Sequence, residues 1–195
     1  MTATPAGSWS ASIRRPQVAS ALLVGLLAVG ALLATLGLRA MTEGSTITIT
    51  QGGVSAAVPD GWYVKPGAGE LAFIVTDTRA SDLKYVARVI DPLGVSAATV
   101  AKQQSETKAA LLTGYVPIDT TAVTVNGATG VRVRYAYLAT GPAGSMPRLV
   151  RGMDLYVPAG TSVVGLSYES PAATYEEGLD QFYRFVSSAR VEAAS

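Results

Sequence analysis

The longest hydrophobic pattern in the chain is an uncharged segment from Val18 to Leu38, which lies between Arg15 and Arg39. About twenty residues with a helical rise of about 1.5 Å span roughly 30 Å, the thickness of the hydrocarbon core of a bilayer. We therefore expect residues 18–38 to form one transmembrane helix. Within it, small residues at a four-residue spacing would allow a second helix to pack closely, unless they only reflect the abundance of Ala and Gly; they are Ala21, Gly25, Gly30 and Ala34.

The charges beside this segment predict its orientation. The tail before it contains Arg14 and Arg15 and no acidic residue, which favours a cytoplasmic N-terminus and an exported C-terminal domain. A cleaved signal peptide is the competing interpretation, but the apolar run exceeds the roughly 7–15 residues of a signal core and no small-x-small cleavage site follows it. The predicted organisation is a cytoplasmic tail (1–17), a transmembrane helix (18–38), a linker (39–46), an exported domain (47–190) and a short tail (191–195).

Beyond the linker, the pattern is typical of β-strands, because apolar and polar residues alternate over short runs separated by turns. Asn126-Gly127 is a strong hairpin signal between two of these runs. The predicted strands are 47–50, 54–58, 70–75, 85–90, 121–125, 131–138, 149–157 and 162–168.

Two helices are expected among these strands. Ser96 is a suitable N-cap for a helix over 97–113, which has only a weak apolar side and should lie on the surface of a sheet. Pro171 is expected to open the last helix, because proline is tolerated at a first helical position. An apolar stripe on that helix should pack onto the sheet; it consists of Tyr175, Leu179, Phe182 and Val186. The predicted fold class is α+β, an antiparallel sheet covered by helices in an α-β-α sandwich.

The composition excludes several classes of function. The chain has no His and no Cys, so the commonest zinc and copper ligands, the usual catalytic bases and the thiol nucleophiles are missing. We therefore expect no metal, no cofactor and no enzymatic activity. When Arg14, Arg15 and Arg39 are left out, the rest of the chain contains 12 basic and 14 acidic residues, which gives it a net charge of −2. A nucleic-acid-binding domain would be clearly basic, so we expect no nucleic-acid partner.

The order of the motifs resembles the PsbP-like superfamily, which includes small exported bacterial lipoproteins. The matching segments are Val54-Ser-Ala-Ala-Val-Pro-Asp-Gly-Trp62, the mid-chain helix, the hairpin through Asn126-Gly127, and the C-terminal segment Phe185-Val-Ser-Ser-Ala-Arg190. The resemblance covers roughly residues 47–190 and implies an α-β-α sandwich that acts as a binding or assembly module. Because this chain has a predicted transmembrane anchor in place of a lipidated cysteine, no partner and no functional residue can be carried over.

Four arginines form the candidate binding site: Arg132, Arg134, Arg148 and Arg151. The first two project from one face of a strand, because side chains alternate with a period of two. The odd spacing of the other two places them on opposite faces of the next strand, so a hairpin brings only one to the pair. Guanidinium groups fit carboxylates and phosphates, which would allow a small anion, a lipid headgroup or an acidic protein to bind. The alternative is a solvated sheet face with Asp154 as the cross-strand counter-charge.

The leading functional hypothesis is a single-pass protein of the bacterial cytoplasmic membrane whose exported domain binds other proteins, as an accessory or assembly subunit of an envelope complex. The alternative is an extracytoplasmic domain that binds a small anionic ligand or lipid.

Overall fold

Most of the described chain is β-structure, as the alternating pattern predicts. The structure is a computed structural model, and it describes residues 46–79, 83–141 and 146–191. The predicted transmembrane helix, with Ala21, Gly25, Gly30 and Ala34, lies outside these ranges, as do the tail 1–17 and nearly all of the linker. Within them, no helix has both the length and the hydropathy that a membrane span requires.

Ten strands and two α-helices are described. The strands are β1 (Thr46–Gln51), β2 (Val54–Pro59), β3 (Tyr63–Pro66), β4 (Leu71–Thr76), β5 (Lys84–Ile90), β6 (Val116–Val125), β7 (Ala128–Ala139), β8 (Arg148–Ala159), β9 (Ser162–Pro171) and β10 (Arg190–Val191). The helices are α2 (Ala97–Leu111) and α3 (Leu179–Ser188), the latter preceded by a 3-10 turn, η1 (Glu176–Gly178). This is a mostly β, α+β fold.

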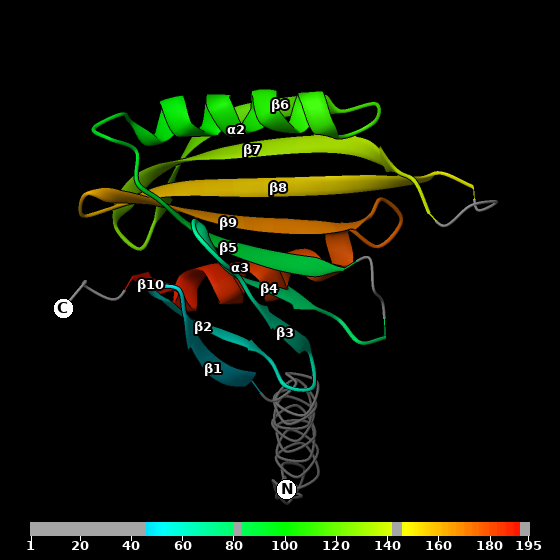
Figure 1. The fold of residues 1–195 in the computed structure, drawn as a ribbon. Helices are drawn as coiled ribbons and strands as arrows, with labels where there is room; N and C mark the ends of the chain where they lie inside the picture. The colour runs from blue at the N-terminus through cyan, green and yellow to red at the C-terminus, as the bar shows by residue number, and fades with distance from the viewer. Residues whose placement is uncertain (1–45, 80–82, 142–145, 192–195) are drawn as a thin grey trace, which may run out of the picture. The chain divides into compact units, whose positions relative to one another are not determined.

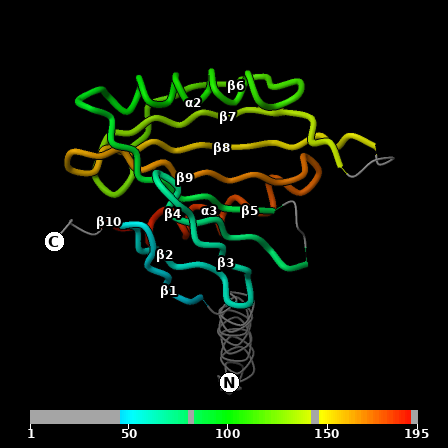
Figure 2. Tube along the Cα trace, in the orientation of Figure 1, coloured from blue at the N-terminus to red at the C-terminus, as the bar shows by residue number. Residues whose placement is uncertain are grey.

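Seven strands form one antiparallel sheet in the order β3-β4-β5-β9-β8-β7-β6 (Figures 1 and 2). A smaller sheet has the order β1-β2-β10. The β6–β7 hairpin turns at Asn126 and Gly127, whose φ angles of +49° and +84° belong to the left-handed region that this turn requires. The hairpin signal in the sequence is therefore confirmed.

The two helices pack on opposite faces of the large sheet. On the first, here called the α3 face, Tyr85, Met153 and Tyr168 point toward the fully buried Phe182 and Phe185 of α3. Strand β2 packs against the same core and contacts α3. The apolar stripe predicted for the last helix is confirmed, because its four members are buried or packed against this core.

Helix α2 packs on the other face, here called the α2 face, against β7 and β8 (Figure 1). Only Ala97, Val100 and Ala101 of its 15 residues are buried, so apolar contact is confined to its N-terminal half. The predicted weak apolar side and surface position of this helix are confirmed. The N-cap is also confirmed, since the Ser96 hydroxyl accepts a hydrogen bond from the backbone N–H of Thr99 at 3.2 Å.

Several predicted boundaries are wrong. Pro171 does not open the last helix: it ends β9, paired with Val150 of β8, and α3 begins eight residues later. A strand end tolerates proline, and the intervening turn is fixed by the Tyr168 hydroxyl, which donates to the carbonyl of Tyr175 at 2.9 Å. Strand β3 was not predicted, β6 begins at Val116 rather than residue 121, and α2 ends two residues early.

Replacing the N-cap tests the start of α2. We expect Ser96→Ala to lower the free energy of unfolding by about 1 kcal/mol, because the N–H of Thr99 loses its acceptor. Urea denaturation, monitored by circular dichroism, measures this change in the free energy of unfolding. Ser96→Asp keeps an acceptor at the same position and should remain close to the wild type; equal losses in both variants would contradict the capping role.

Candidate functional site

The structure separates the four predicted arginines by face. Arg132 and Arg134 of β7 lie on the α3 face, opposite Leu155 and Met153 of β8. Arg151 lies on the same face, whereas Arg148 is paired with Ala139 on the α2 face. The hairpin thus brings one β8 arginine to the β7 pair, as the odd spacing predicts. Whether these arginines bind a ligand stays a prediction.

Two of these three arginines have carboxylate partners. Nε of Arg134 donates to Oδ2 of Asp119 on the edge strand β6 at 2.7 Å, and this hydrogen bond is the main cause of the lowered pKa of Asp119. Nη1 of Arg151 donates to Glu176 at 2.7 Å, and its guanidinium lies 4.2 Å from the centre of the Tyr175 ring.

Asp154, the predicted counter-charge, is not the partner of Arg132 or Arg134. It is paired with Val133 in the β7–β8 register, so it points to the α2 face, away from Arg132 and Arg134. That part of the alternative interpretation is wrong, because the register of two strands decides which side chains meet and the sequence does not specify it.

Arg132, unlike Arg134 and Arg151, has no carboxylate partner among the described residues. Its Nε atom is buried and has no hydrogen-bond partner in the described part of the chain. The side chain lines a cavity of about 440 Å³ between α3 and the β6–β7 end of the sheet. An unpaired donor of this kind is costly inside a protein.

On the α2 face, a buried network of charged and hydroxyl groups lies beneath α2, and no pattern in the sequence indicates it. Nζ of Lys108, on α2, lies 2.8 Å from both carboxylate oxygens of Asp154 and also donates to the hydroxyl of Tyr135. The Tyr156 hydroxyl donates to Asp154 at 3.1 Å. Asp154 is only 1% exposed, so its charge depends on these partners.

The network continues through Glu169 of β9. This carboxylate accepts hydrogen bonds from the hydroxyls of Tyr135 at 3.0 Å and Tyr137 at 2.6 Å, and its Oε2 lies 2.7 Å from Nζ of Lys84. We call these seven residues the α2 clasp: Lys84, Lys108, Tyr135, Tyr137, Asp154, Tyr156 and Glu169. The clasp joins α2 to four strands of the sheet, β5, β7, β8 and β9.

A glycine makes room for the centre of the clasp. The Tyr135 ring lies over Gly152, where an added Cβ would be only 2.2 Å from Cζ of the tyrosine. Any larger residue at this position would displace the ring from Lys108 and Glu169.

The clasp shifts the pKa values of its members in opposite directions. Burial raises the pKa of Glu169, but the charges of Lys84 and Lys108 and the hydrogen bonds from Lys84 and Tyr137 outweigh it, so the pKa lies below its usual range. Burial, followed by the charges of Asp154 and Glu169, raises the pKa of Tyr135. Its hydroxyl therefore stays protonated and remains a donor at neutral pH.

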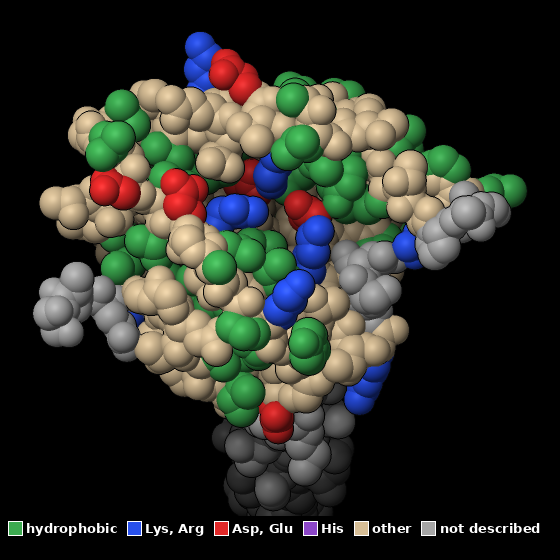
Figure 3. All heavy atoms as spheres, viewed as in Figure 1, with side chains coloured by type: hydrophobic (Ala, Val, Ile, Leu, Met, Phe, Trp, Pro, Cys, Tyr) green, Lys and Arg blue, Asp and Glu red, His purple; other side chains and the backbone are tan. Residues whose placement is uncertain are grey.

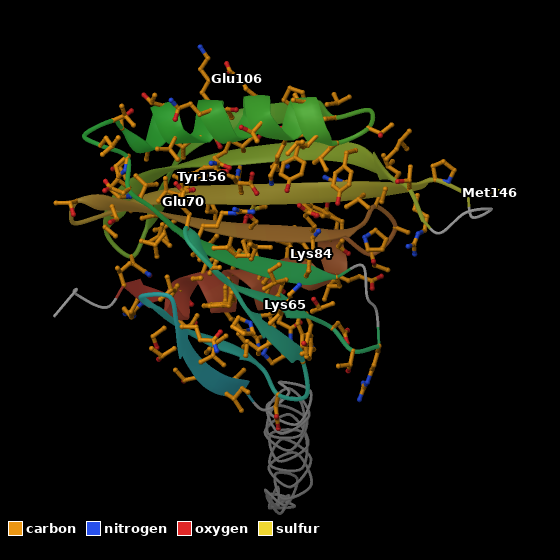
Figure 4. All side chains as sticks on the ribbon, viewed as in Figure 1. Lys65, Glu70, Lys84, Glu106, Met146 and Tyr156 are labelled. Carbon is orange, nitrogen blue, oxygen red and sulfur yellow. The ribbon has the colours of Figure 1, made fainter. Side chains whose placement is uncertain are left out.

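Beside the clasp, the α2 face over β3, β4 and β5 presents side chains to solvent. We call this region the open sheet surface: Tyr63, Lys65, Ile74, Lys84 and Arg88, which register places on one side of the sheet. The main strand contacts of α2 are with β7 and β8, so the helix does not extend over it. Figure 3 shows basic, acidic and apolar side chains together on this side, and Figure 4 shows Lys65, Lys84 and Glu70 there.

Three of the five residues of the open sheet surface are basic. Lys84 is paired with Glu169, whereas Lys65 and Arg88 form no ion pair within the residues described. Tyr63 is 62% exposed, which is unusual for a large aromatic side chain on a sheet. This combination of an exposed ring and unpaired cations is a candidate protein-binding surface. In the described ranges, no three acidic residues are grouped closely enough to hold a metal ion.

Removing Lys108, one of the two cations of the clasp, tests the role of the clasp. We expect Lys108→Met to lower the free energy of unfolding by about 3–5 kcal/mol, because Asp154 would remain buried without its charged partner. Urea denaturation measures the loss. Lys102→Met is the matched control, since Lys102 is 79% exposed and should change stability by less than about 0.5 kcal/mol. A loss below about 1 kcal/mol at Lys108 would contradict the clasp.

The lowered pKa of Glu169 predicts a pH dependence. A carboxyl group with a depressed folded-state pKa contributes stability above its ordinary value of 4.5, and loses that contribution as the pH falls through the folded-state value. We therefore expect stability to decrease more steeply between pH 6 and pH 3 in the wild type than in Glu169→Gln. Urea denaturation at several pH values gives the two slopes. Glu106→Gln, on the outer side of α2, should keep the wild-type slope; equal slopes in all three proteins would refute the prediction.

The solved structures that match this chain share one fold. No family model and no curated protein sequence matches the chain. The solution structure of cyanobacterial PsbP (CyanoP) from Synechocystis matches with a TM-score of 0.56 and 13% identity, over 76% of this chain and 93% of that one. LpqN from Mycobacterium tuberculosis, described as involved in cell envelope biogenesis, matches with a TM-score of 0.50 and 16% identity, over 76% and 91% of the two chains.

The Ran-binding protein Mog1p from Saccharomyces cerevisiae also matches, with a TM-score of 0.50 and 12% identity over 76% of this chain and 96% of that one. At these identities the likeness concerns the fold and not the activity. The resemblance seen in the sequence motifs is confirmed at that level: the chain has the PsbP-like fold, which Mog1 shares.

Proposed function

We propose that this protein is an accessory, non-enzymatic module of a bacterial envelope complex. In this proposal, residues 18–38 anchor it in the cytoplasmic membrane and the PsbP-like domain lies outside the cytoplasm. The apolar segment and the arginines before it support the anchor and its orientation. The PsbP-like fold supports an accessory role, since one protein with this fold takes part in cell envelope biogenesis and another binds Ran.

The open sheet surface carries the proposal. A sheet face is normally covered by other elements, yet here Tyr63 is largely exposed beside Lys65 and Arg88, which have no ion-pair partner in the described ranges. Exposed aromatic and arginine side chains are enriched where proteins bind each other. The complementary partner is a protein segment with apolar and acidic side chains, because two unpaired cations would otherwise be buried without counter-charges.

Charge reversal on this surface tests the proposal. The full-length protein is purified from native membranes through a C-terminal tag, and the stoichiometric partner is quantified by mass spectrometry. We expect Lys65→Glu/Arg88→Glu to reduce the partner at least tenfold, because like charges at an interface are strongly unfavourable. The matched control is Arg79→Glu/Lys102→Glu, which changes the same charge at exposed sites elsewhere.

A photo-reactive phenylalanine identifies the surface directly. At Tyr63 it should cross-link to an acidic segment of that partner, and at Glu106, which projects outward from α2 in Figure 4, it should not. A protein that purifies alone from native membranes, or a charge-reversal variant that retains its partner, would overturn the proposal.

A further inference from the structure

The cavity beside Arg132 has one side chain whose hydrogen-bonding capacity is unused. Nε of Arg132 is buried without a partner, and the guanidinium forms no ion pair with any described residue. Asp119 is the nearby carboxylate: its Oδ2 accepts from Arg134, its Oδ1 is buried without a hydrogen-bond partner among the described residues, and it forms no salt bridge with Arg132. Two guanidinium groups and one carboxylate thus leave one local positive charge, on Arg132.

Three other polar side chains at the cavity, those of Ser187, Tyr183 and Asn126, already have partners. The Ser187 hydroxyl donates to the carbonyl of Arg184 at 2.9 Å, and the Tyr183 hydroxyl lies 3.7 Å from the sulfur of Met153. The amide of Asn126 lies 3.5 Å from the carbonyl of Val186. These groups stabilise the end of α3 and do not compete for Arg132.

About half of the cavity wall is apolar, and the rest is polar. Its volume of about 440 Å³ lies within the usual range for small-molecule sites. The lining includes the side chains of Val123, Val125, Leu155, Tyr183 and Val186. A ligand that fits this wall needs an apolar group as well as an anionic one, because a small hydrated anion would leave the apolar surface in contact with water.

We propose that the cavity beside Arg132 binds a carboxylate attached to an apolar group. The planar guanidinium offers a fork of N–H donors that matches the two oxygens of a carboxylate, while the apolar group contacts Leu155 and Val186. This site lies on the α3 face, so it does not rest on the proposed function, which uses the opposite side of the sheet.

Calorimetric titration of the full-length protein tests the site, with 3-phenylpropanoate and octanoate as probes. We expect both to bind and 3-phenylpropanamide to bind at least tenfold more weakly, because the amide has no charge to pair with Arg132. Arg132→Gln should weaken carboxylate binding about ten- to hundred-fold, since a hydrogen-bonded charge pair is lost. Arg132→Lys should recover only part of the affinity, because an ammonium group cannot form the bidentate pair.

Two further variants test whether carboxylate binding is specific to this cavity. Arg88→Gln changes a guanidinium on the open sheet surface and should leave carboxylate binding intact, even where it weakens binding of a protein partner. Ser187→Phe places a ring at the cavity wall and should weaken both probes while Arg132 is retained. Thermal denaturation verifies that each variant is folded.

A peptide with a free C-terminal Phe, compared with its amidated form, distinguishes a peptide terminus from a small organic acid as the source of the carboxylate. Equal binding of acid and amide, unchanged binding by Arg132→Gln, or no heat of binding at millimolar probe would overturn the proposal.

Discussion

The ion pair between Lys108 and Asp154 attaches the C-terminal half of α2 to β8 of the large sheet. Helix α2 buries apolar side chains only in its N-terminal half, so its C-terminal half depends on the clasp for its position. Because Asp154 and Glu169 lie on β8 and β9, the lysine holds α2 over that side of the sheet and away from β3 to β5. Buried ion pairs add little net stability compared with apolar contacts. We therefore interpret the clasp as a feature that specifies the position of the helix.

Local patterns in the sequence predicted most of the fold. Alternation identified the long strands, and Asn126-Gly127 and Ser96 marked a turn and a cap whose geometry depends only on nearby residues. Strand β3 was missed because four residues ending in Pro66 are too short for a periodic signal. Pro171 was misinterpreted because the same ring suits a helix start and a strand end, and only the pairing with Val150 decides between them.

The candidate sites were less predictable, because they depend on register and on contacts between distant segments. A period of two placed Arg132 and Arg134 on one face, but it could not show that Asp119 pairs with Arg134 and that Arg132 has no carboxylate partner among the described residues. The clasp joins Lys108 to residues 27 to 61 positions later, and no spacing in the sequence indicates such contacts. The predicted membrane helix lies outside the described residues and stays a prediction.

Overall charge is a poor guide to recognition by this domain. The chain beyond Arg39 has a net charge of −2, which would repel an acidic partner at long range. Three cations that have no ion pair among the described residues lie in two local regions: Lys65 and Arg88 lie on the α2 face, and Arg132 lies on the α3 face. Salt screens long-range repulsion within about 10 Å at ordinary ionic strength, whereas contacts at short range persist. A weakly acidic domain can therefore present cations in two separate regions, and in both of our proposals the apolar groups around the cations select the occupant.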